Sequence, residues 1–285
     1  MFLNSRKKLR NMQSMLKLLT QSALREQFDR LQNEAFREDP NSLIPHGYKV
    51  FSQNDEDGII REILNRIGVT SKTFVEFGVG NGLENNSHAL LFDSWRGLWI
   101  EASKRSVNAI RKHFSEIIDT GQLTVVESFI TTENINSLIA DNIDATHIDM
   151  LSIDIDGNDY HVLEAISCID PRLIVLEYNA KFAPPIEFCI DYDETRSWNH
   201  DDCFGASLKF LEGKLRDKGY SLVACGLTGL NCYFVRSDLV EGNFTPPYTS
   251  EHHYQPARYH LRRLESGHPS GYDALIKSRQ TRSGI

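Results

Sequence analysis

The first 39 residues contain neither glycine nor proline, and their apolar positions recur at spacings of three and four, which predicts amphipathic helix. The repeat consists of Leu9, Met12, Leu16, Leu19 and Ala23. It then changes phase, which argues against one long coiled coil. Pro40 and Pro45 interrupt the pattern, so we assign residues 1–45 to an N-terminal helical segment. Three roles fit this segment: packing on the main domain, a subunit contact in a homo-oligomer, or weak contact with a membrane surface through its early basic residues.

From Gly47 onward, short apolar runs alternate with helical stretches, which predicts an α/β domain with a mostly parallel sheet and helices on both faces. The last two runs are joined only by "GLTGL", which is too short for a helical crossover, so we expect this pair to be antiparallel. We assign residues 46–240 to this domain and residues 241–285 to a C-terminal tail or lid. The predicted strands are Thr73–Phe77, Gly97–Glu101, Leu123–Glu127, Met150–Asp154, Leu173–Tyr178, Ser221–Cys225 and Asn231–Arg236.

Composition narrows the class of protein. The chain has 285 residues, enough for one large α/β domain with extra segments. A net charge of -8 does not favour nucleic acid as a partner. The five cysteines are odd in number and include no C-x-x-C pair, which indicates reduced thiols in the cytoplasm and no zinc site. No apolar run is long enough for a transmembrane segment, and the N-terminus lacks the pattern of a signal peptide.

Three glycines follow the first predicted strand in the stretch "FVEFGVGNG": Gly78, Gly80 and Gly82. At that place in an α/β sheet, backbone N–H groups hold polar or anionic ligands. The dinucleotide register G-x-G-x-x-G fails because Leu83 occupies its third glycine position. With Glu76 before the first glycine, the arrangement instead resembles motif I of enzymes that use S-adenosyl-L-methionine (SAM). A glycine-rich turn without a ligand is the alternative.

The next two strand ends carry residues suited to an adenosine. Glu101 ends the second strand, where a carboxylate binds the two hydroxyls of a ribose in SAM and NAD alike. At the end of the third strand, Ser128 is placed to bond an adenine ring and Phe129 to stack on it. Phe129 fits an ordinary core position equally well.

Several motifs together resemble the FkbM-type SAM-dependent methyltransferases, over roughly Phe51 to Arg236. They read "FSQNDEDGII", "FVEFGVGNGLENN", "GLWIEAS", "LSIDIDGND", "LEYNA", "GASL" and "GLNCYFVR". The resemblance implies a Rossmann-like class I methyltransferase fold, SAM as cofactor, and O-methylation of a saccharide or another small molecule in glycan or secondary-metabolite assembly. Two departures mark a divergent branch: Glu76 stands where an Asp is usual, and Asp156 stands where the common pattern has Glu.

The polar stretch before the first strand has two interpretations. Asn54 or Asp55 caps the helix that follows, or Gln53 and Asp57 contact the amino-acid end of SAM, where a carboxylate suits the ammonium group.

Candidate catalytic residues gather at the ends of the fourth and fifth strands. Asp154, Asp156, Glu177 and Asn179 form an oxygen-only set that suits Mg²⁺, and Asp154 is also a cofactor contact. A metal would lower the pKa of an acceptor hydroxyl. The alternative is that Asp154 or Asp156 acts as a plain general base. His200, in the loop after the fifth strand, is a candidate base or substrate contact, although a lone loop histidine often has neither role.

Other classes of function remain open from the sequence. An N-methyltransferase differs from the first hypothesis only in its acceptor. An NAD(P)-dependent oxidoreductase needs the dinucleotide register that is absent here. A non-catalytic SAM-fold binding subunit would not need so many carboxylates at its strand ends.

Overall fold

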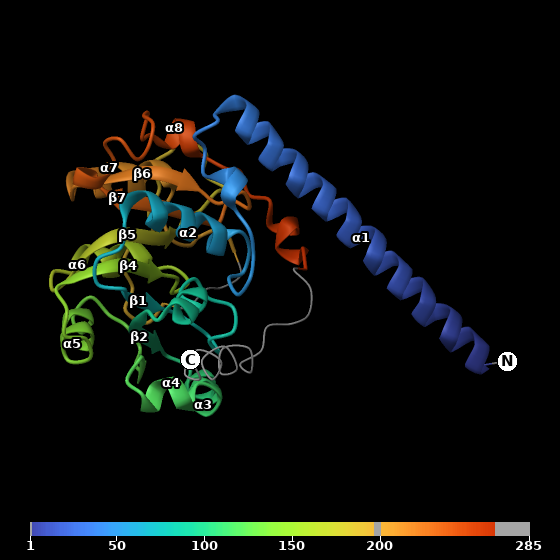
Figure 1. Cartoon of the computed structure of the whole chain (residues 1–285), viewed down its shortest axis with the longest axis horizontal. Coiled ribbons are helices and arrows are strands. Elements are labelled where there is room, and N and C mark those ends of the chain that lie inside the picture. The colour runs from blue at the N-terminus through green and yellow to red at the C-terminus, as the bar shows by residue number, and fades with distance from the viewer. Residues whose placement is uncertain (1, 197–200, 266–285) are drawn as a thin grey trace, which may run out of the picture.

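A seven-stranded sheet forms the centre of the fold (Figure 1). The computed structural model describes residues 2–196 and 201–265. The strand order is β3-β2-β1-β4-β5-β7-β6. The first five strands are parallel, and β7 is antiparallel to both β5 and β6, so the predicted sheet and its terminal hairpin are confirmed. The strands are β1 Thr73–Phe77, β2 Arg96–Glu101, β3 Leu123–Glu127, β4 His147–Ile153, β5 Asp170–Glu177, β6 Tyr220–Cys225 and β7 Asn231–Arg236.

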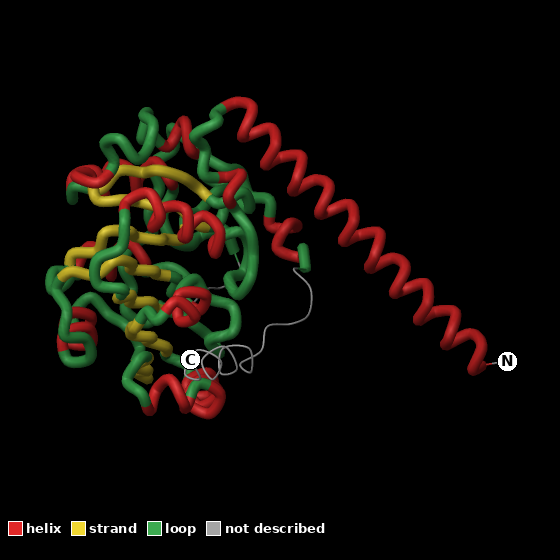
Figure 2. Tube along the Cα trace, in the orientation of Figure 1, coloured by secondary structure: helices red, strands yellow, loops and turns green. Residues whose placement is uncertain are grey.

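Helices cover both faces of this sheet, which explains why the central strands read as continuous apolar runs (Figure 2). Along β1, Phe74 packs in the same cluster as Ile59 of α2, whereas Val75 belongs to the cluster of Val162 of α6. The helices are α1 Phe2–Glu38, α2 Glu56–Ile67, α3 Lys104–His113, α4 Ser115–Asp119, α5 Ile135–Ala140, α6 Asp159–Ala165, α7 Leu208–Asp217 and α8 Ser250–His253, with 3₁₀ turns at Ile44–His46, His88–Asp93, Ser237–Leu239 and Tyr259–Arg263.

Helix α1 is one continuous helix of 37 residues that projects from the sheet domain (Figure 1). Its second half makes the apolar contacts with the domain, through Phe28, which packs with Ile44, Leu227 and Leu261. With 3.6 residues per turn, the docked positions lie roughly a third of a turn away from the first apolar repeat. The phase change noted in the sequence therefore turns the first repeat away from the docked face.

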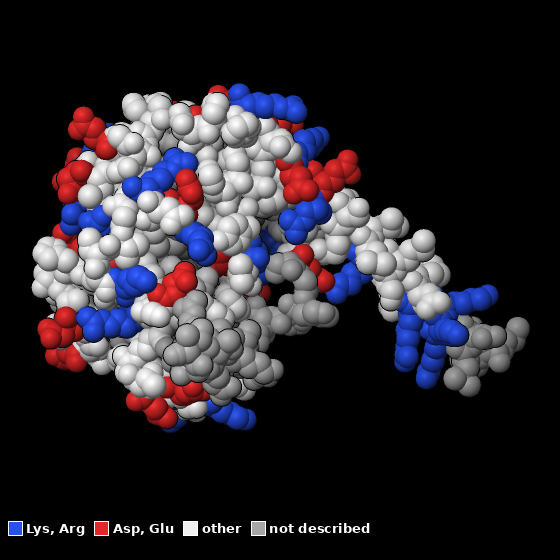
Figure 3. All heavy atoms as spheres, in the orientation of Figure 1, with Lys and Arg blue, Asp and Glu red and all other residues white. Residues whose placement is uncertain are grey.

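The first apolar repeat of α1 is exposed. Met12 and Leu16 are 68% and 66% exposed, and Leu9 and Leu19 are similarly open to solvent. Lysine and arginine side chains gather near the free end of the same helix (Figure 3). No helix in the described ranges is long and apolar enough to cross a membrane.

The C-terminal segment, residues 254–265, returns across the carboxyl end of the sheet to α1. The Arg258 N–H donates to the Thr228 carbonyl in the β6–β7 turn (2.8 Å), and the Tyr178 hydroxyl donates to the Gln255 carbonyl (2.6 Å). At its end, Glu265 pairs with Lys17 of α1 (2.8 Å). The predicted tail thus includes a segment that is fastened over the strand ends.

Candidate functional site

The glycine loop after β1 is open to a ligand at Gly80. A methyl group added there would meet no atom within 4 Å, and the backbone has a φ of +55°, which glycine adopts without strain. The Gly80 N–H donates to Oε2 of Glu101 (2.7 Å), while Oε1 of Glu101 accepts the N–H of Ser103 (2.7 Å). A carboxylate offers about four acceptor positions, so Glu101 keeps capacity for ribose hydroxyls.

The other two glycines of the loop are required for packing. A Cβ on Gly78 would lie 1.6 Å from the backbone oxygen of Asp154, so the loop crosses directly against the end of β4. A Cβ on Gly82 would lie 2.8 Å from the ring of Trp99. Of the three predicted cofactor glycines, Gly80 alone faces open space.

Glu76 shapes the glycine loop from inside the protein, which corrects the prediction that it contacts the cofactor. Its carboxylate is buried and accepts the backbone N–H groups of Asn86 (2.8 Å) and Ser87 (2.9 Å), together with the Ser87 hydroxyl. Burial raises the pKa of Glu76 to about 7, although these hydrogen bonds oppose the change. Both of its oxygens are therefore engaged by the chain itself.

The end of β3 presents an exposed aromatic ring. Phe129 is 51% exposed, so the core alternative for this residue is wrong and its ring is accessible for stacking. Ser128 is held beside Glu101 by the bond from its N–H to the Glu101 carbonyl (3.1 Å), and its hydroxyl donates to the Phe129 carbonyl (3.1 Å). Both residues thus lie at the predicted adenine side of the glycine loop.

The loop before α2 separates two residues that the sequence grouped together. Oδ2 of Asp57 accepts the backbone N–H groups of Val50, Phe51 and Ser52 at 2.6–2.9 Å, so this carboxylate folds its own loop and the geometry does not support a contact with SAM. Gln53, in contrast, lines a cavity at the carboxyl edge of the sheet.

That cavity has a volume of about 210 Å³ and lies at the ends of β4 and β5. A tight turn after β4 shapes its acidic wall. Asp156 has a φ of +60°, and Asp159 holds the turn by accepting the N–H groups of Ile155 (2.9 Å) and Gly157 (2.8 Å). The residues that line the cavity are Gln53, Asp154, Asp156, Glu177, Phe204, Leu230, Asn231, Tyr259 and Arg262.

The carboxyls in this cavity bind protons more tightly than usual. Burial, with a smaller contribution from the nearby charges of Asp159 and Asp156, raises the pKa of Asp154 to about 8. Burial also raises the pKa of Glu177 well above its ordinary value, and the charge of Asp154 adds to this. Arg262 opposes both increases as the nearby positive charge. A carboxyl with such a pKa is suited to exchange a proton near neutral pH.

The prediction of four Mg²⁺ ligands is not supported: Asp154, Asp156 and Glu177 line one cavity, but Asn179 is engaged elsewhere. The Asn179 amide donates to the carbonyls of Asp202 (2.8 Å) and Phe204 (3.0 Å), and its oxygen accepts the Lys181 N–H (3.2 Å). Asn179 thereby fixes the loop after β5. Among the described residues, no group of three or more His, Cys, Asp or Glu side chains is arranged to hold a metal ion. The residues present do not fit Mg²⁺.

Two residues of the cavity could not be identified from the sequence. Tyr259 and Arg262 come from the C-terminal segment, more than 80 residues after β5, and their positions depend on how that segment docks. The only signal in the sequence is the cluster of aromatic and basic residues in "YQPARYHLRRL". His200, the predicted base, lies outside the described residues.

A sheet of this order, with a glycine loop after β1, a carboxylate at the end of β2 and an antiparallel β7, defines a class I methyltransferase fold. The family model "Methyltransferase FkbM domain" matches residues 33–222, and the chain belongs to this family. It is therefore a SAM-dependent methyltransferase. No curated protein sequence matches the chain.

Solved structures resemble the chain at low sequence identity. A protein assigned as a caffeoyl-CoA O-methyltransferase from Staphylococcus aureus is 16% identical, with a TM-score of 0.46 over 76% of this chain and 99% of that one. An O-methyltransferase from Bacillus cereus in complex with S-adenosylhomocysteine (SAH) is 15% identical, with a TM-score of 0.42 over 74% and 89%. The glycopeptide N-methyltransferase MtfA in complex with SAM is 16% identical, with a TM-score of 0.38 over 67% and 96%.

Proposed function

We propose that this chain is an O-methyltransferase that acts on a hydroxyl group of a saccharide or another small-molecule acceptor. The observation that carries the proposal is the position of the acidic cavity. Asp154 lies beside the glycine loop, because Gly78 packs directly on its backbone oxygen, and it also lines the cavity at the ends of β4 and β5. The cofactor loop and the acidic cavity are therefore adjacent.

Gly80, Glu101, Ser128 and Phe129 would hold the adenosine part of SAM, and Gln53 faces the cavity into which its amino-acid part would extend. When bound, SAM supplies an electrophilic methyl group. The chain must then align an acceptor hydroxyl and remove its proton. Asp154 is the proposed base, with Asp156 on the same wall as the second candidate, and Arg262 and Tyr259 enclose the acceptor from the C-terminal segment.

The test uses methyl-labelled SAM with a panel of neutral and acidic saccharides and amines. The expected result is SAH formation with a saccharide and loss of at least ~100-fold in rate in Asp154→Asn, the range for removal of a general base. Asp156→Asn is the matched variant on the same turn, and a larger loss there would assign the base to Asp156. Methylation of amines alone would establish the N-methyltransferase alternative. Tight NAD(H) binding without SAH binding would overturn the proposal.

We also infer that α1 mediates self-association. The exposed positions Leu9, Met12, Leu16 and Leu19 follow the three-four spacing of helices that pack against each other. Gln13 and Thr20, which would flank such a contact, are uncharged, whereas Lys8 flanks it beside Leu9, so charge repulsion between two copies would arise near the free end of the stripe and not along the rest of it.

A further inference from the structure

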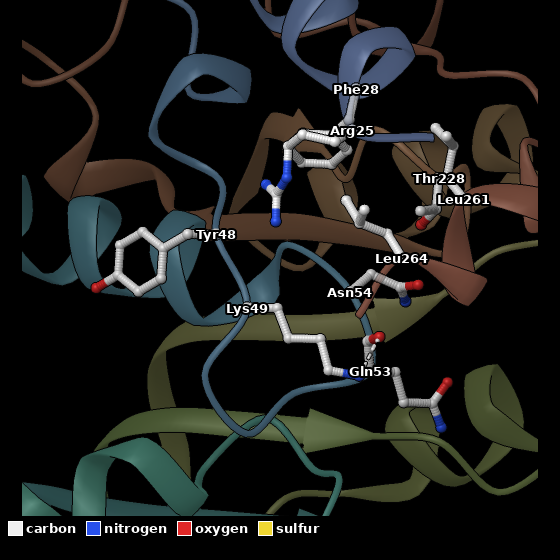
Figure 4. Close-up of a pocket in the computed structure, with 9 residues that line it drawn as sticks. All are labelled: Arg25, Phe28, Tyr48, Lys49, Gln53, Asn54, Thr228, Leu261 and Leu264. Atoms are coloured by element: carbon white, nitrogen blue, oxygen red, sulfur yellow. Dashed lines mark hydrogen bonds between the residues drawn. The ribbon is translucent and has the colours of Figure 1, made fainter. Parts of the chain in front are cut away.

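A second cavity lies next to the acidic one, beneath the docked half of α1 (Figure 4). Its volume is about 160 Å³, whereas one water needs only roughly 10–15 Å³. Its walls come from α1, the loop before α2, the β6–β7 turn and the C-terminal segment. They are formed by Arg25, Phe28, Tyr48, Lys49, Gln53, Asn54, Thr228, Leu261 and Leu264.

Two buried oxygens in these walls lack a hydrogen-bond partner within the described ranges. They are Oδ1 of Asn54 and Oγ1 of Thr228, in residues that are 7% and 1% exposed. The Asn54 amide nitrogen donates to Glu56 (2.8 Å), which fixes the side-chain orientation and leaves Oδ1 as an acceptor. Buried polar atoms are usually paired, because leaving one unpaired costs about 1–3 kcal/mol. A ligand that carries hydroxyl groups would satisfy both atoms.

The charge of this cavity is opposite to that of its neighbour. Arg25 extends from α1 toward the loop that carries Tyr48 and Lys49 (Figure 4). In the described part of the chain, Arg25 has no hydrogen bond or ion pair, whereas Lys49 pairs with Glu84 (3.2 Å). An unpaired guanidinium at a cavity suits a carboxylate or phosphate, which it binds through two parallel hydrogen bonds.

A pair of side chains separates the two cavities. Gln53 lines both of them, and Arg262 of the acidic cavity donates to Oε1 of Gln53 (2.8 Å). A ligand that passes this pair reaches both sites. One of its units would then lie against Asp154, and the next would lie between Arg25 and Thr228.

We propose that this second cavity is a subsite for an acidic, hydroxyl-bearing unit of the acceptor, namely a saccharide unit with a carboxylate or phosphate. The inference deepens the proposed function and rests on it, since the acidic cavity is taken as the place of methyl transfer. Phe28 and Leu261 provide the apolar wall for the sugar ring, Asn54 and Thr228 bind its hydroxyls, and Arg25 binds its acidic group.

The experiment measures binding of glucose, glucuronic acid and glucose 6-phosphate to the full chain by ligand-observed NMR, in the presence of saturating SAH. We expect the two acids to bind more tightly than glucose. Thr228→Val should weaken sugar binding about fivefold, the value of one hydrogen bond, and Thr228→Ser should restore it. Arg25→Gln should remove the preference for the acids, and Arg10→Gln, the matched change at the exposed end of α1, should have no effect. A stronger response to one acid identifies carboxylate or phosphate as the acidic group.

Stability and cofactor binding serve as independent readouts. Thr228→Val removes a hydroxyl that has no partner among residues 2–196 and 201–265, so its melting temperature should equal or exceed that of the wild type. SAH affinity should be unchanged in every variant. Absence of binding for all three sugars, or wild-type binding in both Thr228→Val and Arg25→Gln, would overturn the subsite. Failure to bind SAH would instead overturn the proposed function, and the sugar titrations would still decide on the subsite.

Discussion

The backbone N–H of Gly80 donates to the carboxylate of Glu101 across 2.7 Å, and this bond joins the glycine loop after β1 to the end of β2. The same carboxylate accepts the N–H of Ser103 just before α3. Glu101 therefore connects three parts of the structure: the glycine loop, its own strand end and the start of a helix. A ribose bound between Gly80 and Glu101 would meet a carboxylate that is already fixed in place, which reduces the entropy lost on binding.

The first prediction concerns Glu101. Glu101→Gln keeps an acceptor for one of the two N–H groups, of Gly80 and Ser103, that Glu101 binds, and it removes the charge that strengthens hydrogen bonds to ribose hydroxyls, each worth about 1.5–3 kcal/mol. We expect SAH affinity, measured by calorimetry, to fall about 10- to 100-fold. Glu127→Gln is the matched control, because Glu127 pairs in register with Glu101 on β3. Equal losses in the two variants would contradict a specific ribose contact.

The second prediction is that alanine substitutions at two glycines of one loop, Gly78 and Gly80, differ in their effect on stability. Gly78→Ala places a methyl group against the Asp154 carbonyl and should destabilise the fold by about 3 kcal/mol or more. Gly80→Ala meets open space, and its positive φ should cost only about 1–2 kcal/mol. Thermal unfolding measures the loss of stability in each variant. In the folded Gly80→Ala protein, the affinity for SAH should also fall. A Gly78→Ala protein as stable as the wild type would contradict the close packing of loop and strand.

The sequence was sufficient to predict the sheet because burial on both faces leaves long apolar runs, and because "GLTGL" is too short for a crossover. Local patterns also predicted that Gly80 and Glu101 lie at strand ends, whose positions follow from the fold, and their role in holding the cofactor stays a prediction. Glu76 and Asp57 were misjudged for one reason. A carboxylate next to a cofactor loop can bind either the ligand or the N–H groups of the loop, and only coordinates distinguish these roles.

The wall formed by Tyr259 and Arg262 was not predictable. Its residues follow β5 by more than 80 positions, and no periodic pattern connects the two regions. Their placement depends on tertiary contacts such as the bond from the Arg258 N–H to the Thr228 carbonyl in the β6–β7 turn. The role of Asn179 was not predictable for a different reason. An amide at a strand end serves equally well as a metal ligand or as an anchor for a loop, and the sequence does not distinguish the two.

The third prediction concerns pH. His88 is fully buried and its ring stacks on Phe51 with centroids 4.0 Å apart. Burial lowers the pKa of His88 to about 4. As pH falls below about 6.5, the unfolded chain binds a proton that the folded protein does not, so stability is lost from there down to about pH 4. Each unit by which the pH is lowered in this window reduces the free energy of unfolding by up to about 1.4 kcal/mol.

His88→Phe keeps the aromatic packing and removes the imidazole that binds a proton in the unfolded chain. The free energy of unfolding of the wild type, relative to that of the variant, should therefore fall as pH is lowered from 6.5 to 4.5. Urea titrations at several pH values measure this difference. Burial also lowers the pKa of His253 to about 4, so some acid sensitivity should persist in the variant. His260→Gln, at an exposed position, should behave as the wild type, and parallel curves for all three proteins would contradict the prediction.

The last prediction concerns the projecting half of α1. Leu16 lies in the exposed apolar repeat, whereas Leu18 is 71% exposed but lies about 160° away from Leu16 around the helix. Leucine and lysine have similar helix propensities, so a change from one to the other tests the surface rather than the helix. Leu16→Lys should reduce the mass measured by light scattering to that of the monomer, because it places a charge in the contact between copies. Leu18→Lys should keep the oligomer. If Leu16→Lys leaves the mass unchanged but abolishes binding to vesicles that contain phosphatidylglycerol, the stripe is a membrane-surface contact and self-association through α1 is wrong.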